Sequence, residues 1–276
     1  MKGGCLVEWF FPKTVDEVIE LLGKEDAVLH GGGTMLLRGG LRPSGKMVDL
    51  SGVESLRQIV MEGGVTSLGG GVTYAEAARR LGESDPDHIL VQSLGKAAAT
   101  PLRNRITLGG SVMAQPLWSD LLGPLTALGA ELRLEGKNSG FFEMAEFLRS
   151  PELRSGNLIH SLRFPSVSWR TWYHRETRTS FDYPAFTLSL LCRQEGGRVK
   201  ELRVVLTGTS KKVERLLGVE ERFQGRDAEE RNFRNLEEFL PETFVDRPHG
   251  SASYLRSVAA VALERGLRKL MGGDAA

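Results

Sequence analysis

The sequence predicts an α+β protein, and three observations support this class. Short helices with clear capping signals alternate with strand-like segments in the first 165 residues. Several of those strands run directly into clusters of glycine, and the chain contains 33 glycines in all. Beyond Pro165 the pattern changes to longer strand-like segments followed by charged helical stretches. With 276 residues the chain has room for two domains, and we expect a boundary near residues 165–170.

The first helix is expected after Pro12. Thr14 and Glu17 have the spacing of a capping box, in which each side chain accepts a hydrogen bond from a backbone amide near the other. The apolar residues that follow repeat at the spacing of one helical face, and Gly23 is a natural end. Residues 27–29 then read as a short buried strand that runs into Gly31-Gly32-Gly33.

A related pattern follows. Residues 65–68 predict a strand, residues 69–71 a glycine turn, and Thr73 with Glu76 a second capping box for a helix over residues 74–81. A third glycine turn, residues 108–111, follows the basic segment 103–105. A further helix is expected at residues 121–128, and strands at residues 130–134, 158–164, 169–174, 186–193 and 199–206. The charged stretch 220–234 predicts a solvated helix or loop.

Composition excludes several classes of protein. Thirty-six basic residues balance 35 acidic ones, so there is no net field to attract nucleic acid or an anionic membrane. The two cysteines, Cys5 and Cys192, fit a reducing compartment, and two thiols alone cannot hold an iron–sulfur cluster. No signal peptide and no membrane span is evident, so we expect a cytoplasmic protein. The five histidines show no metal-ligand spacing, and no catalytic residue is predicted.

The glycine clusters indicate an anion site. Glycine tolerates positive φ, so consecutive glycines can direct several backbone amides at one phosphate, and Thr34 can add a hydroxyl. For one isolated cluster, a simple tight connection between strand and helix is an equal or better interpretation. The turns do not extend to G-x-G-x-x-G, because Leu36 and Tyr74 occupy the last glycine position, and no P-loop occurs. A Rossmann domain and a P-loop NTPase are therefore disfavoured.

Three motifs occur in order along the chain: Gly31-Gly32-Gly33-Thr34-Met35-Leu36, Leu68-Gly69-Gly70-Gly71-Val72-Thr73 and Arg103-Asn104-Arg105-Ile106-Thr107-Leu108-Gly109-Gly110-Ser111. This order resembles the FAD-binding (medium) subunit of the molybdenum hydroxylases, a family that includes the carbon monoxide dehydrogenase flavoprotein and the flavin domain of xanthine dehydrogenase. The R-N-x-x-T-I/L-G-G pattern is the most specific element. The likeness continues to residues 245–247 and 250–256, so it spans nearly the whole chain.

The resemblance implies an FAD-binding domain of two α+β subdomains, at about residues 1–52 and 53–165. A smaller α+β C-terminal domain, with a small sheet and packed helices, would follow at residues 166–276. It also implies a set of cofactor-binding residues. Those expected around the pyrophosphate are Leu29, His30, Gly31, Gly32, Gly33, Thr34, Met35 and Leu36, those nearby are Gly70, Gly71 and Thr73, and those on the other side are Thr107, Gly109, Gly110 and Ser111.

Three side chains, those of Asp120, His30 and Trp118, have two interpretations each. Asp120 matches the acidic residue that the family places near the FAD ribose, and it equally suits the N-cap of the helix that follows. His30 can contact FAD or simply end its strand. Trp118 lies where the chain departs from the family pattern, residues 113–119, and is better interpreted as a core residue than as a shield of the flavin. Arg175 stands where the family more often has Lys.

The resemblance further implies an oxidoreductase subunit that works inside a heteromer. Electrons would pass from a molybdopterin centre on a large partner, through 2Fe-2S clusters on a small partner, to FAD on this chain and then to an external acceptor; a dimer of heterotrimers is one such assembly. Two alternatives remain. One is a degenerate member without flavin that acts in assembly or as a scaffold, and the other is a stand-alone flavin oxidase, for which no substrate motif is found.

Overall fold

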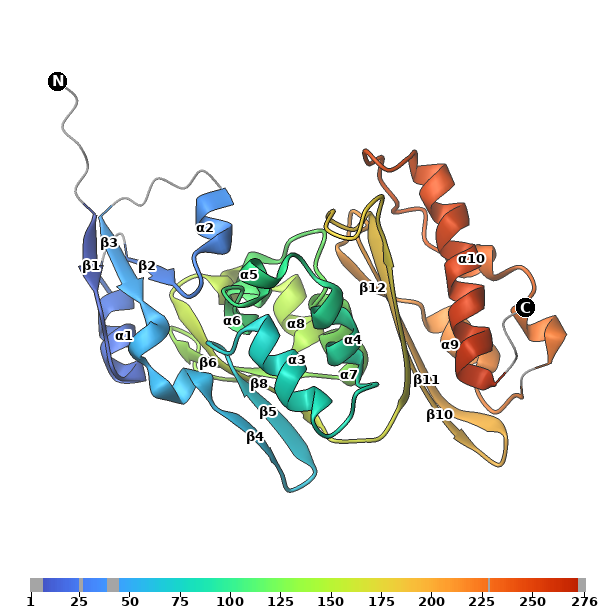
Figure 1. The fold of residues 1–276 in the computed structure, drawn as a ribbon, viewed down its shortest axis with the longest axis horizontal. Coiled ribbons are helices and arrows are strands. Elements are labelled where there is room, and N and C mark those ends of the chain that lie inside the picture. Colours follow the sequence, from blue (N-terminus) through green and yellow to red (C-terminus); the bar gives the residue numbers. More distant parts are fainter. Residues whose placement is uncertain (1–6, 25–26, 39–44, 228, 273–276) are drawn as a thin grey trace. The chain divides into compact units, whose positions relative to one another are not determined.

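The computed structural model of the chain describes residues 7–24, 27–38, 45–227 and 229–272, so Cys5 lies outside the described residues. Helices and strands are mixed throughout (Figure 1), and the predicted α+β class is confirmed. The chain forms two compact units. The first unit comprises Met1–Ala77, Thr100–Ala114 and Gly129–Ser166, and the second comprises Ala78–Ala99, Gln115–Leu128 and Val167–Ala276. The domain division at residues 165 and 166 stays a prediction.

A small parallel sheet begins the first unit. Its strands are β1 (Glu8–Phe10), β3 (Lys46–Asp49) and β2 (Ala27–His30), with β3 in the centre. Because β2 and β3 are parallel, their carboxyl ends meet at one edge, and the loop after β2 starts there.

Helix α1 (Val15–Leu22) forms where its capping box predicted it. The Glu17 amide donates to the Thr14 hydroxyl at 3.3 Å, and the Lys13 amide donates to the Glu17 carboxylate at 2.7 Å. The helix buries Val18 in a small core with Leu56. The Thr14 hydroxyl thus caps the helix as predicted, whereas the Glu17 carboxylate accepts from the amide of Lys13, one residue before the cap, and not from that of Thr14 as in the standard box.

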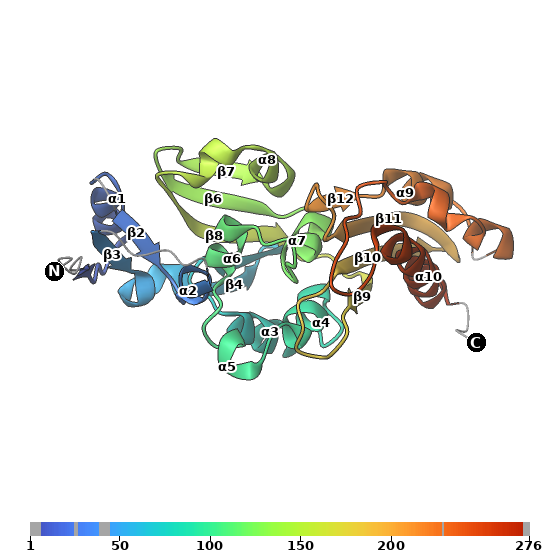
Figure 2. The same cartoon turned by 90° about the horizontal axis from the view of Figure 1, so that it is seen from above.

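A five-stranded sheet forms the larger part of the first unit. Its neighbouring strands are antiparallel and follow the order β4 (Ile59–Glu62), β5 (Val65–Gly69), β8 (Asn157–Pro165), β6 (Glu131–Gly136) and β7 (Gly140–Glu143). The helices of this unit are α2 (Thr34–Arg38), α5 (Thr100–Arg103), α6 (Leu108–Ala114) and α8 (Met144–Arg149). Figure 2 shows α6 against β8. Helix α3 (Tyr74–Gly82) starts in the first unit and ends in the second.

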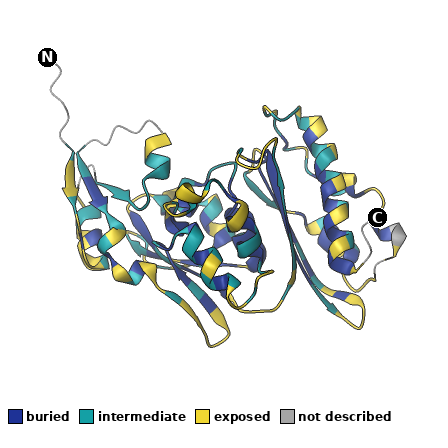
Figure 3. Ribbon diagram, in the orientation of Figure 1, coloured by how far each residue is buried: buried dark blue, intermediate teal, exposed yellow. Residues whose placement is uncertain are grey.

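The second unit is built on a four-stranded antiparallel sheet of β12 (Val213–Arg215), β11 (Arg198–Thr207), β10 (Phe186–Glu195) and β9 (Arg170–Glu176). Helices α4 (Ile89–Lys96), α7 (Leu122–Leu128), α9 (Leu217–Phe223) and α10 (Ala252–Met271) pack on it. Burial extends along nearly all of β10 (Figure 3), which predicts cover on both faces.

Alternating residues of β10 divide between the two faces. Leu188 and Leu190 belong to the apolar core shared with α10, whereas Ser189 faces the other side. A Cβ on Gly123 of α7 would lie 2.9 Å from the Ser189 hydroxyl. Gly123 therefore allows the backbone of α7 to approach the sheet closely. A packing role of this kind is a common reason for a glycine inside a helix.

The charged stretch 220–234 differs from its prediction. Glu220 is only 8% exposed, because its carboxylate accepts hydrogen bonds from the Val204 amide at 2.9 Å and from Arg215 at 2.8 Å. Phe223 and Asn232 are also buried. The expectation of a solvated segment was wrong for these buried residues, since charge density along the sequence does not show which charges have partners.

Candidate functional site: a glycine-lined cavity

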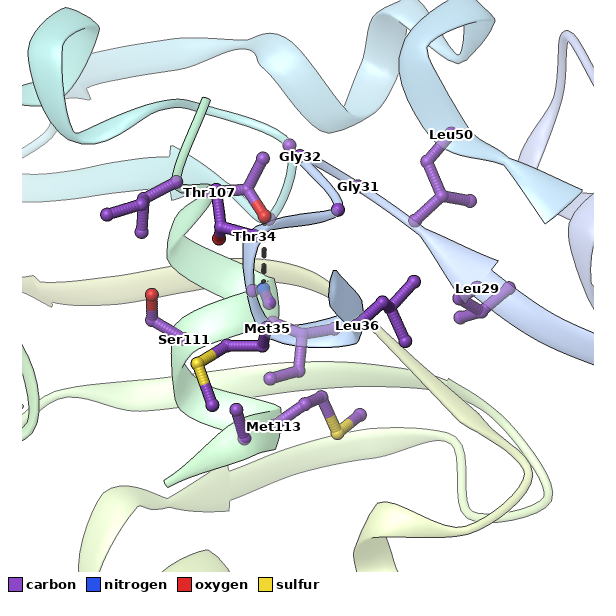
Figure 4. A pocket seen from close by; sticks show the side chains of 18 of the residues that line it. Leu29, Gly31, Gly32, Thr34, Met35, Leu36, Leu50, Thr107, Ser111 and Met113 are labelled. Atoms are coloured by element: carbon purple, nitrogen blue, oxygen red, sulfur yellow. Dashed lines mark hydrogen bonds between the residues drawn. The ribbon is translucent and has the colours of Figure 1, made fainter. Parts of the chain in front are cut away.

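The first unit contains a cavity of about 420 Å³, within the range of small-molecule sites. Segments from β2, α2, the glycine turn after β5, α6 and β8 line it (Figure 4). Among the described residues that line it, the polar side chains are the hydroxyls of Thr34, Thr107 and Ser111, and none is ionisable. An anion in this cavity would therefore depend on backbone amides and hydroxyls.

The first glycine turn joins the end of β2 to the start of α2. Gly33 has φ +75°, a conformation that side chains with a Cβ rarely adopt. Helix α2 begins at Thr34, and the Leu37 amide bonds back to the Gly33 carbonyl. The amides at the start of the first helical turn have no acceptor within the helix. The amides of Thr34, Met35 and Leu36, three residues that line the cavity, are those that the helix itself leaves without an acceptor.

The second glycine turn has a different role. The Gly70 amide donates to the His160 carbonyl at 2.8 Å, and the Gly71 amide donates to the Leu56 carbonyl at 2.7 Å. A Cβ on Gly70 would lie 2.1 Å from the Ile159 carbonyl oxygen. These glycines are required by close approach of backbone to backbone, and their amides are already used inside the protein. This turn shapes the wall of the cavity, and its contact with the pyrophosphate stays a prediction.

The third glycine turn is the start of α6. The Gly109 amide donates to the Gly70 carbonyl at 2.8 Å, which locks the second and third turns together. The Gly110 amide donates to the Thr107 hydroxyl at 3.2 Å, and the Ser111 amide donates to the Thr107 carbonyl at 3.1 Å. Thr107 therefore caps α6 in addition to lining the cavity.

Apolar residues complete the cavity. They are ordinary leucine, isoleucine, methionine and alanine side chains that no motif distinguishes, so the sequence analysis did not assign them to the site. They are Leu50, Leu56, Ile106, Met113, Ala114, Leu158 and Ile159. Their sequence signal is only that Leu158 and Ile159 belong to the strand expected at residues 158–164.

Most of the predicted binding residues meet in this cavity. Those that line it are Leu29, Gly31, Gly32, Gly33, Thr34, Met35, Leu36, Gly70, Gly71, Thr107, Gly109, Gly110 and Ser111. Three others, His30, Thr73 and Asp120, are not among its lining residues. The hydroxyl of Thr73 donates to the Glu76 carboxylate at 2.9 Å in the predicted capping box. The contact of each predicted residue with a cofactor stays a prediction.

His30 lies beneath the first glycine turn. A Cβ on Gly33 would be 2.6 Å from its Nε2. Its Nδ1 is 3.1 Å from a carboxylate oxygen of Asp49, the residue opposite it in the parallel register of β2 and β3. Asp49 was missed in the sequence analysis, because nineteen positions separate the two residues and only strand pairing brings them together.

Asp49 also accepts a hydrogen bond from the Ser51 amide at 2.8 Å. Burial by itself raises the pKa of the Asp49 carboxyl, but the hydrogen bonds from Ser51 and the attraction of His30 outweigh burial, so the net pKa is lowered. The carboxylate is therefore ionised at neutral pH and fixes the orientation of the imidazole under the turn.

Asp120 belongs to a buried cluster within the second unit. The Tyr173 hydroxyl donates to its carboxylate at 2.7 Å and Arg175 Nε donates at 2.8 Å. Burial raises the pKa of Asp120, and Arg175 and Tyr173 offset only part of that effect. The cap of α7 is the Ser119 hydroxyl, which accepts from the amides of residues 121 and 122. The interpretation of Asp120 as the N-cap was wrong.

Trp118 stacks at a tilt on Tyr183, with ring centroids 4.9 Å apart, and is half-buried.

Burial raises the pKa of the Cys192 thiol to about 11, so this cysteine is held as a neutral thiol. Among the described residues, no group of three His, Cys, Asp or Glu side chains is placed to hold a metal ion. No helix of the described chain is both long and apolar enough to cross a membrane.

Several solved structures share the fold of this chain. The chain matches quinoline 2-oxidoreductase from Pseudomonas putida 86 at 23% identity and TM-score 0.88, covering 97% of this chain and 98% of that one. It matches carbon monoxide dehydrogenase from Hydrogenophaga pseudoflava at 22% identity and TM-score 0.86, covering 98% of each. Reconstituted carbon monoxide dehydrogenase from Oligotropha carboxidovorans gives 20% identity, TM-score 0.87, and 98% and 99% coverage.

At these identities the structures show a shared fold alone. No curated protein sequence matches the chain. The family profile for the FAD binding domain in molybdopterin dehydrogenase matches residues 5–167, which is more than half of the chain. The chain belongs to this family of FAD-binding domains, and the resemblance seen in its motifs is confirmed.

The cavity fits FAD in its chemistry. A dinucleotide combines a charged pyrophosphate with flat, largely apolar rings, and the cavity combines free amides and hydroxyls with apolar walls. The lack of ionisable side chains among the described lining residues is compatible with this ligand, because amide dipoles at the start of α2 can stabilise negative charge.

Proposed function

We propose that the chain is the FAD-binding electron-transfer subunit of a molybdenum hydroxylase-type dehydrogenase. The observation that carries the proposal is the cavity of the first unit, where three glycine turns with the family's motifs come together. When bound, FAD supplies the redox chemistry, accepting electrons from one partner and releasing them to an acceptor. The chain's own residues bind and orient the cofactor.

In this proposal the amides of residues 31–34 and the hydroxyls of Thr34, Thr107 and Ser111 hold the pyrophosphate. Apolar side chains such as Leu29, Leu36 and Met113 surround the less polar parts. His30 supports the turn of residues 31–33 from beneath. Thr73 contributes through its capping box with Glu76, and Asp120 through its buried ion pair with Arg175. Residues 1–165 would form the flavin domain and residues 166–276 a C-terminal domain.

Partners supply what this chain lacks. Two cysteines are fewer than the four thiolates that a 2Fe-2S cluster takes. The proposal therefore places the clusters on a small subunit and molybdopterin on a large subunit, in a cytoplasmic heteromer. The carbon monoxide dehydrogenase structures that share the fold include one described as lacking the Mo-pyranopterin moiety of its molybdenum cofactor, which supports a molybdenum centre in that complex.

The test is reconstitution with the subunits encoded beside this chain. We expect the chain to copurify with a cluster-bearing subunit, and we expect bleaching of the flavin absorbance when the assembled complex receives its oxidisable substrate. Copurification of a complex whose flavin stays oxidised while its clusters are reduced would contradict the electron-transfer role. A stable complex without any flavin would favour the scaffolding alternative.

A further inference from the structure

The first glycine turn lies directly against Arg105. A Cβ on Gly32 would be 1.5 Å from the Arg105 carbonyl oxygen, so the two backbones are in contact. The Arg105 side chain returns to the same place, where its Nε donates to the Gly32 carbonyl at 3.1 Å. One residue of the third motif thus holds the first turn both by its backbone and by its side chain.

The segment that carries Arg105 is itself fixed. The Arg105 and Ile106 amides both donate to the Leu102 carbonyl, at 2.9 and 2.8 Å, and the Ile106 carbonyl accepts from the Tyr74 amide at 2.9 Å. Arg105 is therefore a rigid support for the turn. Rigid support reduces the ordering cost that a binding loop meets when a ligand arrives.

Charge adds to this support. Arg105 is exposed and does not line the cavity, and the described part of the lining has no cationic side chain. Among the described residues, the one hydrogen bond of its guanidinium goes to Gly32. The guanidinium offsets the negative charge on the Gly32 carbonyl oxygen that accepts from it. Because that oxygen then repels an anion less, binding of an anion on the amide side of the same turn is favoured.

We propose that Arg105 is a positioning residue for dinucleotide binding, which holds the turn of residues 31–33 in the shape that accepts the pyrophosphate. This proposal rests on the FAD-binding role of the cavity. It assigns a specific task to a position that the family pattern R-N-x-x-T leaves unspecified.

The experiment uses the full chain, stripped of flavin, and compares wild type with Arg105→Ala, Arg105→Lys and the control Arg79→Ala. Arg79 is also an exposed arginine, but it pairs with Glu83 within α3. FAD dissociation is followed by flavin fluorescence, ADP affinity by calorimetry, and folding by the melting temperature of the apoprotein. ADP is included because it shares the pyrophosphate and adenosine portions of FAD.

We expect Arg105→Ala to weaken FAD and ADP by a similar factor of about tenfold, the effect of one charge-assisted hydrogen bond. Arg105→Lys should recover part of the affinity, and Arg79→Ala should match wild type. The apoprotein melting temperature should be the same for all four proteins.

Two outcomes would overturn the proposal. Unchanged FAD dissociation in Arg105→Ala would show that the turn needs no support. A melting temperature that falls in step with FAD affinity would assign Arg105 to folding. Failure of wild type to bind FAD or ADP would instead overturn the FAD assignment of the cavity.

Discussion

The surroundings of Gly32 leave no room for a side chain, whereas those of Gly95 do. Gly32 has the Arg105 carbonyl at 1.5 Å from the place of its missing Cβ, whereas Gly95 in α4 has nothing within 4 Å. The sequence predicted that the clustered glycines matter, because glycine allows close backbone approach. It could not predict which atom each glycine approaches, since that atom belongs to a segment some seventy positions away.

Replacing Gly32 by Ala is predicted to damage the cavity. The added Cβ must displace the turn from Arg105, and forcing extra atoms into a packed site typically costs about 1–3 kcal/mol. We expect a lower free energy of unfolding and a lower flavin content, measured by denaturant titration and by absorbance of the purified protein. Gly95→Ala is the matched control, and its stability should be unchanged or higher by up to about 1 kcal/mol.

Asp49 is predicted to make stability depend on acid pH. Its folded pKa is below the unfolded value of about 3.9, so its contribution is fully present above that pH and is lost as pH falls through the folded pKa. Asp49→Asn keeps a cap for the Ser51 amide but loses the charge beside His30. The stability difference between wild type and Asp49→Asn should therefore shrink as pH is lowered.

Asp49→Ala removes both the hydrogen-bond acceptor for the Ser51 amide and the charge beside His30, so its comparison with Asp49→Asn separates the two contributions. Losing both should cost about 1–2 kcal/mol at neutral pH, more than the Asn variant does. Denaturant titrations at a series of pH values measure all three proteins. A difference between wild type and Asp49→Asn that stays constant into acid would contradict the lowered pKa.

At the level of elements, caps were predictable and pairings were not. Helix α1 and helix α3 start at the boxes of Thr14 and Thr73, because residues three positions apart meet by helix geometry alone. The start of α7 was misread, because Ser119 and Asp120 are both good caps and tertiary contacts decide between them. The Asp120 carboxylate turns toward β9, a partner that local spacing does not show.

The link between α7 and β9 is predicted to behave as a buried ion pair. Asp120 and Arg175 side chains are each 7% exposed, and Arg175 also donates to the Asp182 carbonyl at 2.6 Å. Arg175→Met leaves a buried carboxylate without its cation and should cost about 3–5 kcal/mol. Arg178→Met removes a half-exposed ion pair with Asp182 and should cost less than about 1 kcal/mol.

A double variant tests the cause of that loss. Burial raises the pKa of Asp120, so in Arg175→Met ionising this carboxyl opposes folding, and stability should fall as pH rises from acid to neutral. Adding Asp120→Asn removes the buried charge and should recover part of the stability at neutral pH. Stability is measured by thermal or denaturant unfolding. If the double variant loses as much stability as the Arg175→Met and Asp120→Asn single variants together, this account is contradicted.

For the whole molecule, motif order identified the family before any contact was known, and the family profile confirms it. Three glycine turns that are far apart along the chain line one cavity, which the order of motifs implied. The apolar walls, the support from Arg105 and the His30–Asp49 pair arise only when strands pair and loops pack. The central claim for the molecule is that this cavity holds FAD.

The most direct test is the visible absorption spectrum of the purified chain, followed by identification of the flavin released on denaturation. We predict flavin absorbance, with released FAD equimolar to the chain and strongly reduced in Gly32→Ala. A colourless wild-type protein that takes up no added FAD would contradict the account.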